Sequence, residues 1–174
     1  ATNPDVPTAG QVWYNTTDNV LRYDKGVTGA AWSSGGNLNS GRRFLAGAGT
    51  QTAALGFGGG PPVVDNSEEY NGTAWTEGNN LNTARMKLAG CGTQTAGLAF
   101  GGASDSDDSE SYNGTSWTEV ANMNTGRDEL GGIGAATAAL AVGGHPTNAN
   151  NELYNGTAWT EVADINTGRH AMGA

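Results

Sequence analysis

Four arginines recur at a nearly constant spacing and are the first candidates for chemistry in this chain of 174 residues. Each closes a motif Asn-Ser/Thr-Gly/Ala-Arg, and they are Arg42, Arg85, Arg127 and Arg169. A ring of guanidinium groups on one face can hold the carboxylate or sulfate of an acidic glycan. The alternative is a structural ion pair between neighbouring repeats, because Glu68, Glu110 and Glu152 keep the same spacing. We favour the ion pair, since a residue present in every repeat usually stabilises the repeat.

A second candidate is the acidic segment 104–110, which has the sequence Ser-Asp-Ser-Asp-Asp-Ser-Glu. The carboxylates of Asp105, Asp107 and Asp108 are hard oxygen ligands of the kind that calcium prefers. The segment lacks the glycine and the spacing of a calcium-binding loop, and the equivalent segments 60–66 and 145–151 carry no acidic cluster. We therefore favour a solvated loop and predict no metal site.

These three segments are also the parts of the repeat that vary most. Residues 61–64 are Pro-Pro-Val-Val, residues 105–108 are Asp-Ser-Asp-Asp and residues 145–146 are His-Pro, while the flanking sequences match. Variable loops on a rigid scaffold are where recognition usually occurs, although neutral drift in exposed loops explains the variation equally well. The predicted ligand-binding residues are therefore the four arginines, the three aspartates and His145.

Groups suited to catalysis are few. The chain has two histidines, His145 and His170, and neither has an acidic or nucleophilic partner that recurs with it. The sequence contains no Gly-x-Ser-x-Gly elbow and no phosphate-binding loop. The single cysteine, Cys91, stands among glycines, where we expect a buried thiol. We predict no catalytic residue and no cofactor.

The arginines belong to a repeat of 42 or 43 residues, and this repeat decides the predicted architecture. Aromatic residues and glycine pairs follow the same step: Trp32, Trp75, Trp117 and Trp159; Tyr70, Tyr112 and Tyr154; Gly58-Gly59, Gly101-Gly102 and Gly143-Gly144. Several residue types that share one period indicate a repeat architecture.

Each unit predicts four short strands. In the last complete unit the predicted strands cover residues 130–134, 137–142, 152–154 and 157–162, and Asn155-Gly156 is a strong hairpin signal. The first strand is rich in Ala and Gly, which suits an innermost strand near an axis. Four strands in roughly 40 residues make a blade, so we predict an all-β propeller of four-stranded antiparallel blades.

The two ends of the chain complement each other in this scheme. Residues 11–15, 20–23 and 30–33 predict three strands, and residues 169–174 predict a fourth. We predict that they close one blade, which gives four blades in a single domain; a fragment of a larger ring is the alternative. The predicted boundaries are 1–36 for the N-terminal strands of the closing blade, 37–78, 79–120 and 121–162 for the three other blades, and 163–174 for the closing strand.

The unit resembles the kelch repeat over residues 38–169. In the middle unit the matching residues are Gly101-Gly102, Glu110, Tyr112, Trp117, Met123 and Arg127. The resemblance implies blades in which such Arg–Glu pairs are structural. The stretch Thr-Ala-Gly-Gln-Val-Trp-Tyr-Asn-Thr-Thr at residues 8–17, with Leu21-Arg22-Tyr23 and Trp32, is similar to a module of bacteriophage tail-fibre and structural proteins, marine phages especially.

This second resemblance implies a non-enzymatic virion protein that presents a propeller for attachment to a host surface or glycan. One alternative is a structural component that decorates a capsid or tail without any ligand. Another is a propeller-fold glycan-active enzyme, since sialidases and copper radical oxidases also use propellers.

The net charge and the hydropathy of the chain limit the classes of partner that it can bind. The net charge is −9, with eight Lys plus Arg, which argues against nucleic-acid binding. The chain has no apolar run long enough to span a bilayer, so we expect no membrane insertion. The expected partners are other virion proteins and a host-surface glycan or protein, with a homo-oligomer left open. The expected location is the virion surface or the extracellular space.

Overall fold

The computed structural model describes residues 12–15, 20–23, 34–146 and 148–171. The chain divides into two compact units, Ala1–Ser34 and Gly35–Ala174. The first unit contains strands β1 (Val12–Asn15) and β2 (Val20–Tyr23), which pair antiparallel with Val12 opposite Tyr23. Both strands were predicted from the sequence. The third strand predicted there, at residues 30–33, lies outside the described residues.

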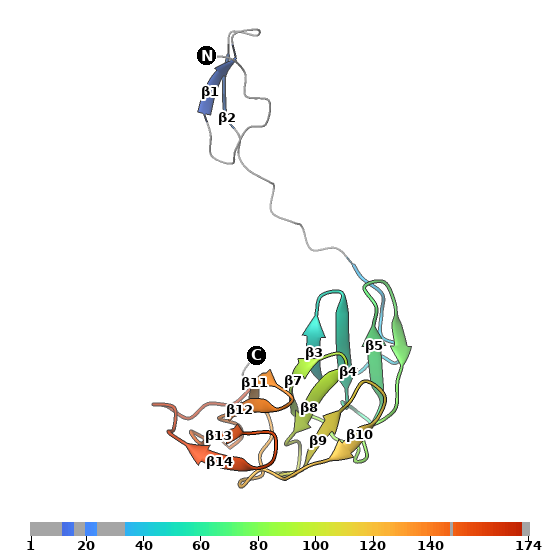
Figure 1. Ribbon diagram of the computed structural model, residues 1–174, viewed down its shortest axis with the longest axis vertical. Coiled ribbons are helices and arrows are strands. Elements are labelled where there is room, and N and C mark those ends of the chain that lie inside the picture. The colour runs from blue at the N-terminus through green and yellow to red at the C-terminus, as the bar shows by residue number, and fades with distance from the viewer. Residues whose placement is uncertain (1–11, 16–19, 24–33, 147, 172–174) are drawn as a thin grey trace. The chain divides into compact units, whose positions relative to one another are not determined.

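The second unit contains three four-stranded antiparallel sheets in which the strands follow chain order (Figure 1). The first sheet is β3 (Ala46–Thr50), β4 (Ala53–Phe57), β5 (Ser67–Tyr70) and β6 (Trp75–Glu77). The second sheet is β7 (Ala89–Thr93), β8 (Ala96–Phe100), β9 (Ser109–Tyr112) and β10 (Trp117–Glu119). The third sheet is β11 (Gly131–Ala135), β12 (Ala138–Val142), β13 (Asn151–Tyr154) and β14 (Trp159–Val162). The described residues form no helix, so the all-β prediction and the four-strand unit are confirmed.

The hairpins form where the sequence predicts them. Between β5 and β6 the Asn71 side-chain oxygen accepts hydrogen bonds from the backbone N–H groups of Thr73 and Ala74. Gly72 has a φ of 91°, which a residue with a side chain rarely adopts. The same arrangement recurs at Asn113 and Asn155, so the Asn-Gly turn closes the outer hairpin of every sheet.

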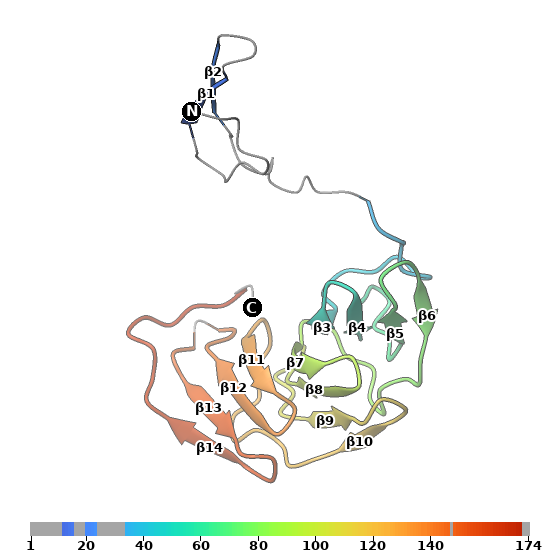
Figure 2. The ribbon, with the colours of Figure 1, turned by 45° about the horizontal axis from the view of Figure 1, so that its top comes forward.

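The three sheets stand side by side through their first strands. Figure 2 shows β3, β7 and β11 on the inside and β6, β10 and β14 on the outside. Glycine makes this approach possible, because a Cβ at Gly90 in β7 would overlap the ring of Phe57 from the first sheet. A Cβ at Gly132 in β11 would lie 2.9 Å from the ring of Phe100. The prediction of small residues in the innermost strand is therefore confirmed, and the sheets have a blade-like arrangement.

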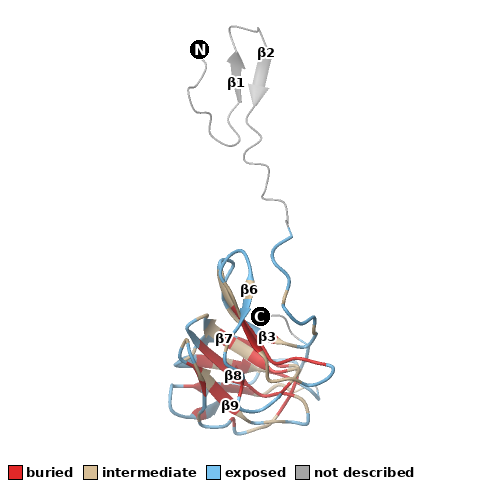
Figure 3. Ribbon diagram, turned by 90° about the vertical axis from the view of Figure 1, so that its right-hand side faces the viewer, coloured by how far each residue is buried: buried red, intermediate tan, exposed pale blue. Residues whose placement is uncertain are grey.

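Aromatic residues fill the space between neighbouring sheets, as the repeat predicts. The rings of Phe57 and Trp117 lie 4.8 Å apart, and the Trp117 indole N–H donates to the Ser67 hydroxyl at 2.8 Å. The next pair of sheets repeats this contact with Phe100 and Trp159, whose rings lie 5.0 Å apart. Buried residues are most frequent in the second and third strands of each sheet, and Figure 3 shows the burial along the ribbon.

The closing blade stays a prediction. Residues 169–171 form no strand, and residues 172–174 lie outside the described residues. The structure describes β1 and β2 only as a separate unit. The third sheet has an exposed apolar surface at Ile133, Leu153 and Val162, which are 58%, 45% and 39% exposed.

Gly90→Ala should destabilise the protein, because the added methyl group overlaps the Phe57 ring. Overpacking of this kind costs about 1–3 kcal/mol of unfolding free energy, measurable by urea denaturation. Gly41→Ala is the matched control, since no atom lies within 4 Å of a Cβ at that position. Equal stabilities of the two variants would contradict the tight packing of the sheets.

Candidate functional site

One edge of the sheets gathers all the candidate residues. Strand pairing places the end of β4, the start of β5 and the end of β6 at the same edge of the first sheet, because Phe57 lies opposite Ser67 and Glu68 opposite Glu77. The loops 58–66, 101–108 and 143–150 therefore share this edge with the connections 78–88 and 120–130 and with the segments 35–45 and 163–171. We call this edge the loop face, and the last four segments the connections.

Three of the four repeated arginines form buried ion pairs with the repeated glutamates. The pairs are Arg42–Glu68, Arg85–Glu110 at 2.7 Å and Arg127–Glu152 at 3.3 Å. These side chains are at most 4% exposed. The structure therefore places three of the predicted ligand-binding arginines in structural ion pairs. Each pair lies within one repeat, where it joins the connection to its own sheet, and not between neighbouring blades as predicted. Their guanidinium groups do not lie on the surface.

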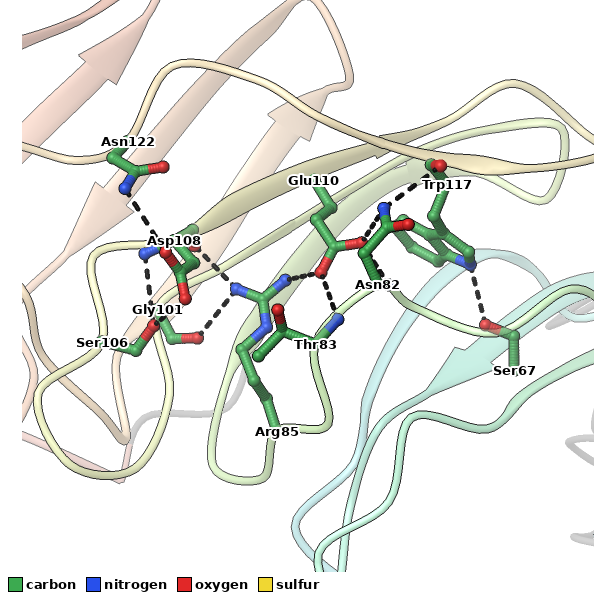
Figure 4. Close-up of polar contacts among 10 residues, drawn as sticks. All are labelled: Ser67, Asn82, Thr83, Arg85, Gly101, Ser106, Asp108, Glu110, Trp117 and Asn122. Atoms are coloured by element: carbon green, nitrogen blue, oxygen red, sulfur yellow. Dashed lines mark hydrogen bonds and ion pairs between the residues drawn. The ribbon is translucent and has the colours of Figure 1, made fainter.

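Each pair ties a connection to the sheet that it enters (Figure 4). Arg85 donates to the backbone carbonyls of Asp108 at 2.7 Å and Gly101 at 3.3 Å. It thereby holds both ends of the loop 101–108. At Arg127, which is fully buried, desolvation lowers the guanidinium pKa and the Glu152 carboxylate opposes that shift.

An asparagine completes each pair, and the sequence analysis assigned it no role. Asn82 donates its backbone N–H and its side-chain amide to Glu110, at 2.7 and 2.9 Å, and also donates to the Trp117 carbonyl. Asn124 makes all three equivalent bonds, and Asn39 makes the backbone bond to Glu68 and the side-chain bond to the Trp75 carbonyl. The signal was present in the sequence, since the asparagine opens the same motif that the arginine closes. The carboxylates are thus saturated with donors and are poor candidates for a catalytic base.

Arg169 differs from the other three arginines. It is exposed and makes no ion pair with any carboxylate among the described residues. Its own glutamate would belong to the sheet that follows the third. In the sequence, the position 43 residues before Glu68 holds Lys25. Among the four predicted arginines, Arg169 is the one that the structure leaves accessible.

Every Lys and Arg of the unit Gly35–Ala174 lies on a connection. Three are buried in the ion pairs, and the accessible ones are Arg43, Lys87 and Arg169. A hydrogen bond from Lys87 to Glu129 raises the pKa of the Lys87 ammonium. This edge carries all the accessible positive charge of the unit, and carboxylates such as Asp105, Asp107, Asp128 and Glu129 lie on it as well.

Backbone hydrogen bonds hold the variable loops in the same frame. The second glycine of each pair donates to the carbonyl of the next repeated arginine, at 2.8 Å for Gly59 and 3.0 Å for both Gly102 and Gly144. The paired glycines have positive φ, for example 66° at Gly58 and 111° at Gly59, which explains the glycine pair of the repeat. Side chains in the loops can therefore vary while these backbone bonds stay the same.

The remaining predicted residues lie on the same edge. Asp105 and Asp107 are exposed, while Asp108 accepts hydrogen bonds from Ser106 at 3.2 Å and Asn122 at 3.3 Å. Across the described ranges, no three His, Cys, Asp or Glu side chains group in a way that could hold a metal ion. His145 is exposed, with its Nδ1 3.6 Å from an Asp128 carboxylate oxygen.

Cys91 lies in β7, away from the loop face. It is 6% exposed, and burial raises the pKa of its thiol to about 11. A thiol of this kind is a weak nucleophile and a weak metal ligand near neutral pH.

Comparison with known proteins supports the fold and nothing more specific. No protein-family description matches the chain, and no curated protein matches it. Among solved structures, it is similar to YjhT, with a TM-score of 0.60 and 12% sequence identity. The similarity covers 74% of this chain and 53% of YjhT, so the chain spans about half the length of that protein. At this identity the likeness concerns the fold alone.

Glu110→Ala should strongly destabilise the protein. It leaves the Arg85 guanidinium buried without its carboxylate, and breaking such a pair costs about 3–5 kcal/mol of unfolding free energy. The control is Glu119→Ala, which removes an exposed carboxylate from β10, opposite Glu110, and should change stability by less than about 0.5 kcal/mol. Urea denaturation measures both. A loss at Glu110 no larger than the control would mean that the pair does not hold the connection.

Proposed function

We propose that this chain is a non-enzymatic β-propeller module of a virion surface protein, and that it attaches to a host-surface glycan or protein through its loop face. The observation that carries the proposal is a contrast in the loops 58–66, 101–108 and 143–150: they share backbone hydrogen bonds, whereas their side chains and the conformations of their tips differ. Recognition surfaces on rigid scaffolds have this character. The accessible cations on the same edge add a preference for anionic ligands. The virion setting rests on the sequence resemblance to phage modules.

We further propose a ring of four blades, the fourth made by strands from the two ends of the chain. One supporting observation is a chain of backbone hydrogen bonds near the inner strands: Lys87 N–H donates to Phe44, Glu129 to Lys87 and Ala171 to Glu129, at 2.8–2.9 Å. These four residues occupy one repeat position and all have φ between 52° and 61°. A four-blade ring would complete the circle with a bond from Phe44 N–H to the Ala171 carbonyl.

The free surface of the third sheet supports the same proposal. Asn151 stands where Ser67 and Ser109 accept an indole N–H from the next sheet. Its side-chain oxygen is buried and has no hydrogen-bond partner among the described residues. A further blade would bring a tryptophan to this oxygen, and the sequence offers Trp32, 43 residues before Trp75.

Gly47→Ala tests the ring. Gly47 is the first-sheet equivalent of Gly90, yet a Cβ there would meet only the Leu55 carbonyl, at 3.4 Å. In a closed ring, Tyr14 of the fourth blade takes the place that Phe57 has at Gly90, since it stands 43 residues earlier. We expect Gly47→Ala to cost about 1–3 kcal/mol of unfolding free energy, and much less in a Tyr14→Ala background. A neutral Gly47→Ala would refute closure by this chain.

Attachment is tested by applying the labelled full chain to an array of neutral and acidic glycans and to intact host-type bacterial cells. We expect binding that falls at least tenfold in a loop-face variant, Val63→Ser with Asp105→Asn and His145→Ala. Asn suits the positive φ of 54° at position 105. The matched control changes three exposed threonines in the opposite hairpins, Thr73→Ala with Thr115→Ala and Thr157→Ala, and should bind like the parent.

A structural component without a ligand is the second candidate. The exposed Ile133, Leu153 and Val162 favour it, because cross-strand pairing places them on one surface of the third sheet, with Leu140 and Asn151. If the chain binds no glycans or cells and Gly47→Ala does not change its stability, the apolar surface of the third sheet is the surface that binds another virion protein. This combination of results would replace the attachment proposal with the structural one.

A further inference from the structure

A hollow opens on the loop face where the inner strands begin. Its volume is about 190 Å³, and it is bordered by Phe44, Lys87, Glu129 and Ala171, together with the leucine that follows each of the first three. The four bordering residues have the same left-handed backbone but different side chains: an aromatic ring, a cation, an anion and a methyl group. When equivalent positions share a strained backbone but carry different side chains, those side chains often belong to a binding site rather than to the scaffold.

Phe44 borders this hollow with a partly exposed aromatic ring. It is 44% exposed, which is unusual for a large aromatic residue, and it occupies a φ of 59° that disfavours it. The Arg43 guanidinium lies over the Phe44 ring, 5.0 Å from its centre, and the Lys87 ammonium lies 5.9 Å from that centre. The structure thus holds a partly exposed aromatic ring with two cations over it.

The two cations are not equivalent. Lys87 is neutralised by Glu129 at 2.7 Å and lies 3.7 Å from Asp128. Arg43 is exposed, and within the described part of the chain its side chain makes no ion pair. Arg43 also lines a second hollow of about 400 Å³, together with Gly41, Arg42, Gly60 and Pro61. Arg43 is therefore a guanidinium that borders this second hollow and lies over the Phe44 ring, without a carboxylate partner among the described residues.

We propose that Arg43 and Phe44 bind a carboxylate-bearing sugar residue of an acidic glycan. The apolar C–H face of a pyranose ring packs on an exposed aromatic ring, and a guanidinium binds a carboxylate through two parallel hydrogen bonds. The second hollow has room for a neighbouring sugar. The inference rests on the proposed attachment function and names the ligand class and the residues that select it.

The test is a ¹⁵N NMR titration of the full chain with a glucuronate-terminated disaccharide, against the matching glucose-terminated disaccharide as the neutral control. We expect amide shifts at Phe44 and Lys87 with the acidic sugar alone, and binding that weakens as salt rises. Arg43→Gln and Phe44→Asn should each weaken binding at least tenfold. Asn tolerates positive φ, so Phe44→Asn should keep the melting temperature of the parent. Thr157→Gln, which changes an exposed side chain in the hairpin at the opposite edge of the third sheet, should bind like the parent.

Three results would overturn the inference. They are equal binding of the neutral and acidic disaccharides, unchanged affinity in Arg43→Gln, and no shifts at Phe44 and Lys87 with the acidic disaccharide. If the acidic disaccharide shifts only residues of the loops 58–66, 101–108 and 143–150, the inference fails while attachment through the loop face stands. If the chain also binds no glycan on the array and no cells, the attachment proposal itself fails.

Discussion

In each of the three four-stranded sheets, a buried glutamate carboxylate on the third strand binds the connection that leads into that sheet. Glu110 accepts hydrogen bonds from the Asn82 backbone, the Asn82 side chain and the Arg85 guanidinium. Removing this carboxylate from water is costly, and the cost is offset because several charged or polar donors converge on it. Arg85 in turn holds the carbonyls at both ends of the neighbouring loop. The geometry of the loop face therefore depends on these pairs.

A second constraint acts between sheets and is steric. The ring of Phe57 packs where β7 has Gly90, and that of Phe100 packs where β11 has Gly132. Tryptophans of the outer strands then cover these rings and donate to a serine of the preceding sheet. Aromatic packing on glycine sets how closely the sheets approach, and it makes each sheet depend on its neighbour. The third sheet ends this series with apolar residues exposed.

These two constraints divide the positive charges of the unit Gly35–Ala174 into two groups. The arginines of the ion pairs are buried and serve the frame, whereas Arg43, Lys87 and Arg169 lie on the edge that the frame presents. Because the loops are fixed through backbone bonds, their side chains are free to vary without loss of the fold. The separation of an interior held by buried ion pairs from a variable edge is the physical basis of the proposed attachment function.

The sequence by itself determined the strands, the Asn-Gly hairpins and the fact that the repeated arginines pair with the repeated glutamates. These features could be predicted because the same signals recur in each unit: short segments bounded by glycine, Asn-Gly at the turn, and Arg and Glu at one period. In the last unit the predicted strands agree with β11 to β14 within two residues.

Only the tertiary structure decided which charges are buried and which are accessible. Arg42 and Arg43 are neighbours in the chain, yet one enters an ion pair and the other lies exposed beside Phe44. The left-handed backbone at Phe44 and Lys87 gives no sequence signal, since neither residue favours it. Exposure and strain of this kind arise when one sheet packs against the next. The repeat period predicts the features that all units have in common. The exposure and contacts of the residues that differ between units depend on how the sheets pack, so only the folded structure shows them.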